Sequence, residues 1–279
     1  MKELSGLGRP SPVRGVPTDR MSSNYPCESE DGIMKKRIMS ALLAVGMVFT
    51  LLPTAVWAED GIPYLDWDND QKKLVGNTCE SATKVESGIT AWENGWYVVS
   101  ESVTISDRIT VTGEVYLILA DDCTLTAEKG IGVPEGNSLT IYGQAGQSGS
   151  ILATGDDENA GIGGNSGVSG TITINGGIVS ATGGDLGAGI GGGYHGSNGD
   201  ITINGGSVTA EGNRGGAGIG SGEQWSNEGT ITINGGTVTA TGGSGGAGIG
   251  SGPFGDGGII TITGGTVIAD FSGNPPYEF

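Results

Sequence analysis

Apolar and polar residues alternate in short runs along the second half of the chain, and one run, I-T-I-N-G-G with small variations, occurs four times. Its lead isoleucines are separated by 29, 30 and 29 residues: Ile172, Ile201, Ile231 and Ile260. Every copy has a valine seven positions and an alanine nine positions after the lead isoleucine, and A-G-I-G recurs between copies. A period of this length marks an architecture of stacked repeats.

Each repeat contains three short segments, Ile-x-Ile, Val-x-Ala and Ala-x-Ile, in which every second residue is apolar. This is the pattern of β-strands with one buried face. Segments of three or four residues are too short to be stable alone, so each must pair with its equivalent in the next repeat. Glycines between the segments allow the positive φ angles of sharp corners. We therefore expect an all-β fold, a parallel β-helix with coils of 29–30 residues, in which Ile174 lies beneath Ile203, Ile233 and Ile262.

Alternation also precedes the regular repeats. From about residue 100 to residue 160 the spacing of the apolar positions is uneven, which predicts irregular first coils. Residues 59–98, which include Trp92 and Trp96, are expected to form an N-terminal cap, because the open end of a solenoid core needs a cover. Residues 99–279 would then form the β-helix. The fourth repeat stops after Ala269 without its A-G-I-G segment, so we expect a truncated C-terminal end, with a poor cap as the alternative.

The beginning of the chain is typical of an export signal. Residues 34–58 start with the charged M-K-K-R, continue with an apolar run and end with small residues at Val56 and Ala58, as secretory signal peptides do. The apolar run is too short for a stable membrane anchor. We therefore expect a secreted or cell-surface location and no membrane insertion of the mature chain. Residues 1–33 are interpreted as an extension from a misassigned start site, with a long natural signal peptide as the alternative.

Charge and cysteines narrow the partners further. Cleavage after Ala58 leaves 221 residues, with six of the 13 basic and 26 of the 31 acidic residues. Such an acidic surface repels nucleic acid and anionic lipid, so neither is an expected partner. The 57 glycines do not indicate a disordered linker, because a linker would not keep isoleucine, valine and alanine in register over four copies. Cys79 and Cys123 either form a disulfide in an exported setting or remain two separate buried thiols.

Several stretches carry a resemblance to a known group of proteins. They are G-W-Y-V-V at 95–99, the alternating segment 109–127, N-S-L-T-I-Y-G-Q at 137–144, and A-G-I-G-G followed by I-T-I-N-G-G. These residues resemble exported carbohydrate-binding-domain proteins, adhesin-like β-helices of Gram-positive gut anaerobes, over about residues 62–270. The resemblance implies a right-handed β-helix that binds glycans or mediates adhesion, with a polysaccharide or a host or plant glycan as its partner.

The loops between A-G-I-G and the next I-T-I vary in sequence, and each holds one aromatic residue. Stacking of coils would place these aromatic residues on one edge of the solenoid, where repeat proteins usually bind their ligands. Aromatic faces beside carboxylates and amides suit a sugar chain; local packing of each ring over its own corner is the alternative. The predicted ligand-binding residues are Tyr194, His195, Asp200, Glu223, Trp225, Glu228, Phe254 and Asp256.

The sequence does not favour catalysis. A glycoside hydrolase needs a pair of carboxylic acids at a defined separation, whereas the outward positions are mostly threonine, serine and glycine. The only histidine, His195, has no acidic partner that spacing identifies. The segment D-W-D-N-D-Q from Asp66 lacks the glycine and glutamate of an EF-hand, so we expect no cofactor and leave only a structural Ca²⁺ open.

A non-catalytic glycan-binding or adhesive module is thus the predicted function. A purely structural surface stalk is the main alternative, because the repeats need no ligand to explain them. A polysaccharide lyase or hydrolase and an ice-binding surface are less favoured. Thr237, Thr239 and Thr241 hint at a threonine array of the ice-binding kind, but Glu211 interrupts this array one coil earlier.

Overall fold

The short alternating segments form β-strands, and each strand pairs with its equivalent in the next coil. A computed structural model describes residues 55–223, 229–253, 255–256 and 258–272, with side chains from residue 61 onward. All of these residues belong to one unit of the chain, residues 41–279. They form 23 strands, and no helix occurs among them. The fold of this part is therefore all-β, as the sequence predicts.

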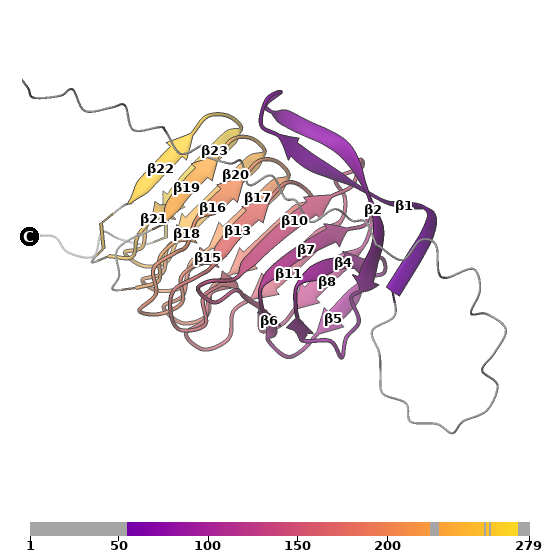
Figure 1. Ribbon diagram of the computed structural model, residues 1–279. Helices are drawn as coiled ribbons and strands as arrows, with labels where there is room; N and C mark the ends of the chain where they lie inside the picture. Colours follow the sequence, from indigo (N-terminus) through magenta and orange to yellow (C-terminus); the bar gives the residue numbers. More distant parts are fainter. Residues whose placement is uncertain (1–54, 224–228, 254, 257, 273–279) are drawn as a thin grey trace, which may run out of the picture. The chain divides into compact units, whose positions relative to one another are not determined.

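Three sheets run along the stack of coils, and each complete coil contributes one strand to each sheet (Figure 1). The coil strands of sheet A are β4 (Gly95–Val99), β7 (Glu114–Leu119), β10 (Ser138–Gly143), β13 (Thr171–Ile174), β16 (Ile201–Ile203), β19 (Thr230–Ile233) and β22 (Ile259–Ile262). Those of sheet C are β5 (Val103–Ile105), β8 (Thr124–Ala127), β11 (Ser150–Thr154), β14 (Ile178–Thr182), β17 (Ser207–Glu211), β20 (Thr237–Gly242) and β23 (Thr266–Phe271). Those of sheet B are β3 (Ala91–Trp92), β6 (Ile109–Val111), β9 (Ile131–Gly132), β12 (Ile162–Gly163), β15 (Ile190–Gly191), β18 (Ile219–Gly220) and β21 (Ile249–Gly250).

Pairing between coils is parallel and in the register that the repeat predicts. Ile174 pairs with Ile203, Ile203 with Ile233, and Ile233 with Ile262. The valine and alanine positions of sheet C pair in the same way, Val208 with Val238 for example. The first three of these isoleucines are fully buried, and burying one isoleucine side chain contributes about 1.5–3 kcal/mol. The predicted parallel β-helix is confirmed.

Coil length is uniform only in the second half of the chain. In sheet A, Gly95 pairs with Val115, Val115 with Leu139, and Leu139 with Ile172, so the first coils advance by 20, 24 and 33 residues. From Ile172 onward the spacing is the predicted 29–30 residues. The early loops can differ in length because only the buried strand positions must stay in register.

Residues 59–98, predicted as a cap, divide into a part that packs in the core beside the first coil and a part that forms a hairpin outside it. Val85 and Trp92 belong to the core cluster and lie beside the first coil strands; Trp92 is fully buried and its ring stacks on that of Tyr97, with 5.4 Å between centroids. The preceding residues form an antiparallel hairpin of β1 (Ala55–Asp68) and β2 (Lys73–Lys84), which joins sheet A through pairing of Thr83 with Tyr97.

The hairpin covers an aromatic patch on the outer face of sheet A. Three rings from successive strands lie there, Trp96, Tyr116 and Tyr142, with 4.9 Å between the first two centroids and 5.4 Å between the first and third. Tyr64 of β1 packs on this patch, 5.0 Å from Trp96 and 4.8 Å from Tyr142. The hairpin lies outside the solenoid beside the first coils (Figure 1) and shields these rings from water.

The Asn-Gly-Gly corners contain a ladder of side-chain hydrogen bonds. Asn234 Nδ2 donates to Asn204 Oδ1, and Asn204 Nδ2 donates to Asn175 Oδ1, each at 2.8 Å. Asn175 Nδ2 donates to Asp66 Oδ1 of the hairpin at 2.9 Å, and Thr263 Oγ1 donates to Asn234 Oδ1 at 2.7 Å. We call these five residues the asparagine ladder. Hydrogen bonds in such chains polarise one another, so the ladder holds both the coils and the hairpin in place.

Arg108 joins three early coils. Its Nε donates to Asn165 Oδ1 at 2.6 Å, and its Nη1 donates to the carbonyl oxygens of Lys129 and Ala160 at 2.7 and 3.0 Å. Burial lowers the pKa of the guanidinium to about 10, although Asp156 at 3.9 Å acts in the opposite direction. The buried cation is therefore held by hydrogen bonds to carbonyl and amide oxygens more than by its ion pair.

The cysteines do not form the bridge that the sequence leaves open. Cys123 is a free thiol at the edge of the core, so it is not joined to Cys79. Burial, with smaller effects of Asp122, Glu101 and Asp121, raises the pKa of the Cys123 thiol. Its protonated form is thus favoured, which makes it a poor nucleophile.

Candidate functional site

The loops that follow the strands of sheet B stack from coil to coil. These strands are two residues long and end in a glycine with positive φ, 130° at Gly191 and 142° at Gly220, where the chain turns into the loop. The Gly193 N–H donates to the Gly167 carbonyl of the loop one coil earlier at 3.1 Å, and the His195 N–H donates to the Glu223 carbonyl one coil later at 3.3 Å. The Tyr194 N–H donates to the Glu158 carbonyl, in the turn before β12, at 2.7 Å. The described parts of the variable loops therefore form one edge, which we call the loop edge.

Three of the predicted binding residues meet on this edge. The rings of Tyr194 and His195 have centroids 3.8 Å apart at an interplanar angle of 42°, and His195 has a φ of 55°. His195 is exposed, while Tyr194 and Glu223 are half-buried. The Glu223 side chain lies against Gly215, where an added Cβ would be 2.6 Å from Glu223 Cγ. The rings of Tyr194 and His195 thus lie side by side, and the main chain of Glu223 in the next coil contacts that of His195.

The other predicted residues divide into two groups. Asp200 Oδ1 accepts hydrogen bonds from the Thr230 N–H at 2.9 Å and the Thr230 hydroxyl at 2.8 Å, so this carboxylate links two coils of sheet A. Asp256 is exposed and has no hydrogen bond or ion pair within the described part of the chain. Three predicted residues lie outside the described residues: Trp225, Glu228 and Phe254.

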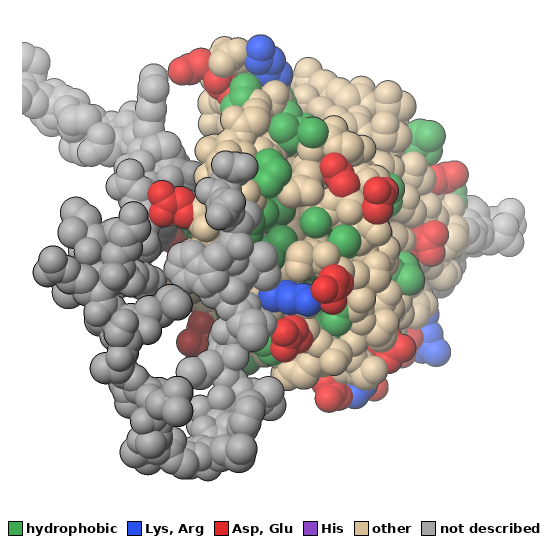
Figure 2. Space-filling view, turned by 90° about the vertical axis from the view of Figure 1, so that its right-hand side faces the viewer, with side chains coloured by type: hydrophobic (Ala, Val, Ile, Leu, Met, Phe, Trp, Pro, Cys, Tyr) green, Lys and Arg blue, Asp and Glu red, His purple; other side chains and the backbone are tan. Residues whose placement is uncertain are grey.

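The acidic turns mostly bind the protein's own backbone and basic groups. Asp121 accepts from the N–H groups of Gly146 and Ser148 at 2.8 and 3.2 Å, and Asp185 pairs with Arg214 at 2.8 Å. Over the described residues, no three side chains of His, Cys, Asp or Glu are grouped so that they could hold a metal ion. Figure 2 shows acidic side chains scattered over one face among backbone and neutral side chains.

The outer face of sheet C is rich in hydroxyl groups. Ser207, Thr209 and Glu211 of β17 pair with three threonines of β20 at 237, 239 and 241, as the sequence predicts. Three exposed aliphatic side chains interrupt the face in other coils: Leu152, Ile178 and Ile268. The three threonines of β20 therefore do not continue as an unbroken array onto β17, where serine and glutamate take two of the three positions.

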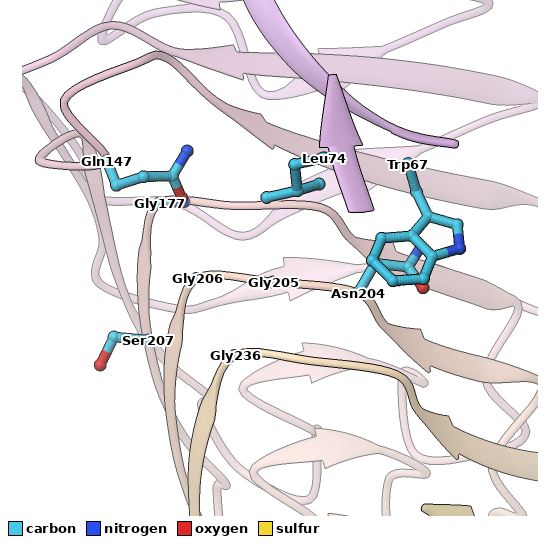
Figure 3. Close-up of a pocket in the computed structure, with 9 residues that line it drawn as sticks. All are labelled: Trp67, Leu74, Gln147, Gly177, Asn204, Gly205, Gly206, Ser207 and Gly236. Atoms are coloured by element: carbon cyan, nitrogen blue, oxygen red, sulfur yellow. The ribbon is translucent and has the colours of Figure 1, made fainter. Parts of the chain in front are cut away.

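A recess lies where the tip of the β1–β2 hairpin meets the corners that join sheet A to sheet C (Figure 3). We call it the corner groove; its volume is about 450 Å³. Its floor is the backbone of three successive corners at Gly177, Gly206 and Gly236, whose φ angles are 80°, 83° and 83°. Trp67 and Leu74, partners across the hairpin, form a wall.

The polar groups of the corner groove are neutral. Gln147 Oε1 accepts from the Gly177 N–H at 2.9 Å and its Nε2 donates to the Gln144 carbonyl at 2.7 Å, while Asn204 belongs to the asparagine ladder. Ser207 is exposed at the rim. The groove was not predictable from local sequence patterns, because it depends on contacts between segments more than a hundred residues apart, such as Asp66 with Asn175.

No helix among the described residues is long and apolar enough to cross a membrane.

Comparisons with known proteins agree with the fold. No curated protein and no solved structure matches the chain. The family model described as β-helix repeat matches residues 172–194, 201–223, 231–253 and 260–274. Structure and family match together identify these repeats as β-helix repeats.

Proposed function

We propose that this chain is a secreted or cell-surface module that binds glycans without cleaving them, and that the loop edge is its binding surface. The observation that carries the proposal is the group of Tyr194, His195 and Glu223 on adjacent coils. Exposed loops held by a rigid scaffold are the usual place for ligand contacts in repeat proteins.

The chemistry of this group suits a sugar. One face of a pyranose ring presents C–H groups, which pack well on an aromatic ring, and its hydroxyls hydrogen-bond to carboxylates and imidazoles. Tyr194 is half-buried and His195 is exposed, so the tilted pair of rings offers an apolar surface with polar atoms at its border. The Glu223 carboxylate, one coil away, would accept hydrogen bonds from a second sugar unit along the solenoid axis.

Two further features support binding in preference to cleavage. Cleavage of a glycosidic bond by the usual route uses two carboxyl groups that face each other across the bond. In the turns that precede the strands of sheet B, Glu158 is engaged by the Ser166 hydroxyl at 3.1 Å, and Asp185 is engaged by Arg214 at 2.8 Å. The outward positions of the strands between the loops are mostly threonine and serine.

The proposal of secretion rests on the signal-peptide pattern of residues 34–58, and nearly all of that segment lies outside the described residues.

The proposal is tested by screening the purified chain on an array of plant and host glycans and measuring the best ligand by calorimetry. Tyr194→Ala should weaken binding by about 1–3 kcal/mol, the usual effect of losing an aromatic anchor. Thr104→Ala, an exposed change on the outer face of sheet C and away from the loops, is the control and should bind like wild type. Equal affinities of wild type and Tyr194→Ala would move the site away from this edge, and a complete lack of binding would favour the structural stalk.

A further inference from the structure

We infer that the corner groove is a second saccharide site, which takes uncharged sugar units of a chain that runs along the solenoid axis. This inference rests on the proposed function, because it assigns a further subsite and a ligand class to the same glycan-binding module. Four features carry it: the floor, the wall, the charge and the direction of the groove.

The floor is open backbone because its corners require glycine. Gly177, Gly206 and Gly236 all have φ angles near 80°, a left-handed conformation that residues with a Cβ rarely adopt. One such corner lies above the next, since the strands on both sides pair in register. A ligand can therefore approach the main chain at Gly206 and Gly236, while the Gln147 side chain already occupies the N–H of Gly177.

The wall is an apolar pair from the hairpin. Trp67 and Leu74 are cross-strand partners, and both are half-buried. Leu74 packs closely on the corner: an added Cβ at Gly205 would be 2.7 Å from Leu74 Cδ1. Figure 3 shows both side chains beside the glycine corners, with Gln147 toward the other end. An aromatic ring that borders a backbone floor provides a stacking surface for the C–H face of a sugar ring.

The size and charge of the groove select the ligand class. Its volume of about 450 Å³ lies within the range of small-molecule sites, roughly 300–1,000 Å³. No charged residue is among its lining residues, and the nearby Asp68 faces Lys73 across the hairpin. The groove therefore offers no ion pair to an anionic sugar such as a uronate or sulfated unit, whereas its amide, hydroxyl and main-chain groups can hydrogen-bond to a neutral unit.

The direction of the groove favours a chain over a single sugar. The column of corner glycines continues to Gly265 in the last described coil, whose φ is 85°. Beyond the hairpin the corners carry no cover from Trp67 or Leu74, so a chain seated in the groove can continue along the same column. Internal units of a linear polysaccharide fit this geometry.

The test is calorimetry with neutral hexasaccharides, namely those of β-1,4-glucose, β-1,4-xylose, β-1,3-glucose and β-1,4-mannose, with hexagalacturonate as the anionic probe. Two variants address the groove. Trp67→Ala removes the wall, and Ser207→Arg places a long side chain at the rim from an exposed position. Thr104→Arg is the matched control, since Thr104 is exposed on the outer face of β5 in the same sheet, at the opposite end of the stack from the groove and off the column of corner glycines.

Both groove variants should bind the best neutral hexasaccharide about tenfold more weakly or worse, while Thr104→Arg stays at the wild-type value. Trp67→Phe, which keeps an aromatic ring, should restore most of the affinity, and circular dichroism serves as the folding control. If Ser207→Arg binds with wild-type affinity while Tyr194→Ala binds weakly, the corner groove is not a saccharide site, and the loop edge remains the proposed binding surface. Absence of binding by wild type would overturn both proposals.

Two other outcomes would also contradict the inference. Tighter binding of hexagalacturonate than of every neutral probe would remove the assigned ligand class. A wild-type dimer in sedimentation that Ser207→Arg dissociates would assign the groove to a second copy of the chain.

Discussion

Asn204 lies in the middle of the asparagine ladder, and its replacement by alanine removes both hydrogen bonds of its amide. Asn175 Oδ1 then loses its donor while it stays buried, and Asn234 Nδ2 loses its acceptor at a half-buried position. A typical hydrogen bond contributes about 0.5–1.5 kcal/mol, and an unsatisfied buried group costs about 1–3 kcal/mol. We therefore expect Asn204→Ala to lower the free energy of unfolding by about 2–4 kcal/mol.

The ladder also predicts an order of effects. Asn234→Ala removes two bonds at a half-buried position, where water can replace one partner, so its cost should be smaller. Thr263→Ala removes one bond at an exposed position and should cost less than about 1 kcal/mol. Urea unfolding followed by circular dichroism measures all three, provided that the m-values agree. Equal costs along the series, or a cost below about 0.5 kcal/mol for Asn204→Ala, would refute a cooperative ladder.

Three further changes have defined outcomes. Ile203→Ala leaves a cavity in a fully buried column and should cost about 2–5 kcal/mol in urea unfolding, whereas the outward Thr202→Ala should change stability by less than about 0.5 kcal/mol. Burial raises the pKa of the Asp66 carboxyl, and the hydrogen bond from the Trp67 N–H opposes this shift only in part. The protonated carboxyl therefore favours the folded state, and this contribution to the free energy of unfolding is lost as the pH rises through the raised pKa. Asp66→Asn should therefore be more stable than wild type at pH 7 and lose this advantage on acidification; a pH-independent difference would contradict the assignment. Gly205→Ala pushes on Leu74 and should speed hydrogen exchange in the hairpin, whereas protection equal to wild type would refute this contact.

The strand register was predictable because each strand has one buried face with a period of two residues. A shift of one residue would expose every isoleucine of a strand such as β16, so the pattern admits one register. The asparagine ladder was not predictable in the same way. Asn-Gly-Gly is a turn signal in any isolated segment, and the bond from Asn204 to Asn175 exists only after two coils have stacked.

The hairpin and the corner groove depend on tertiary contacts that local patterns do not encode. Alternation in the first coils identifies the inward residues, but it does not tell whether outward rings such as Trp96 and Tyr116 face water or a cover. The loop edge was predictable in part. Stacking brings His195 and Glu223 together, whereas the Asp200 carboxylate is used by Thr230 of the next coil.

The central claim, a glycan-binding module that does not cleave its ligand, is tested most directly by incubating the purified wild-type chain with soluble plant and host polysaccharides. Affinity electrophoresis reports binding, and chromatography of the recovered polysaccharide reports its chain length. Retardation by at least one neutral polysaccharide with no change in its chain length is the predicted result. Migration unaffected by every polysaccharide, or shortening of the retained one, would contradict the account.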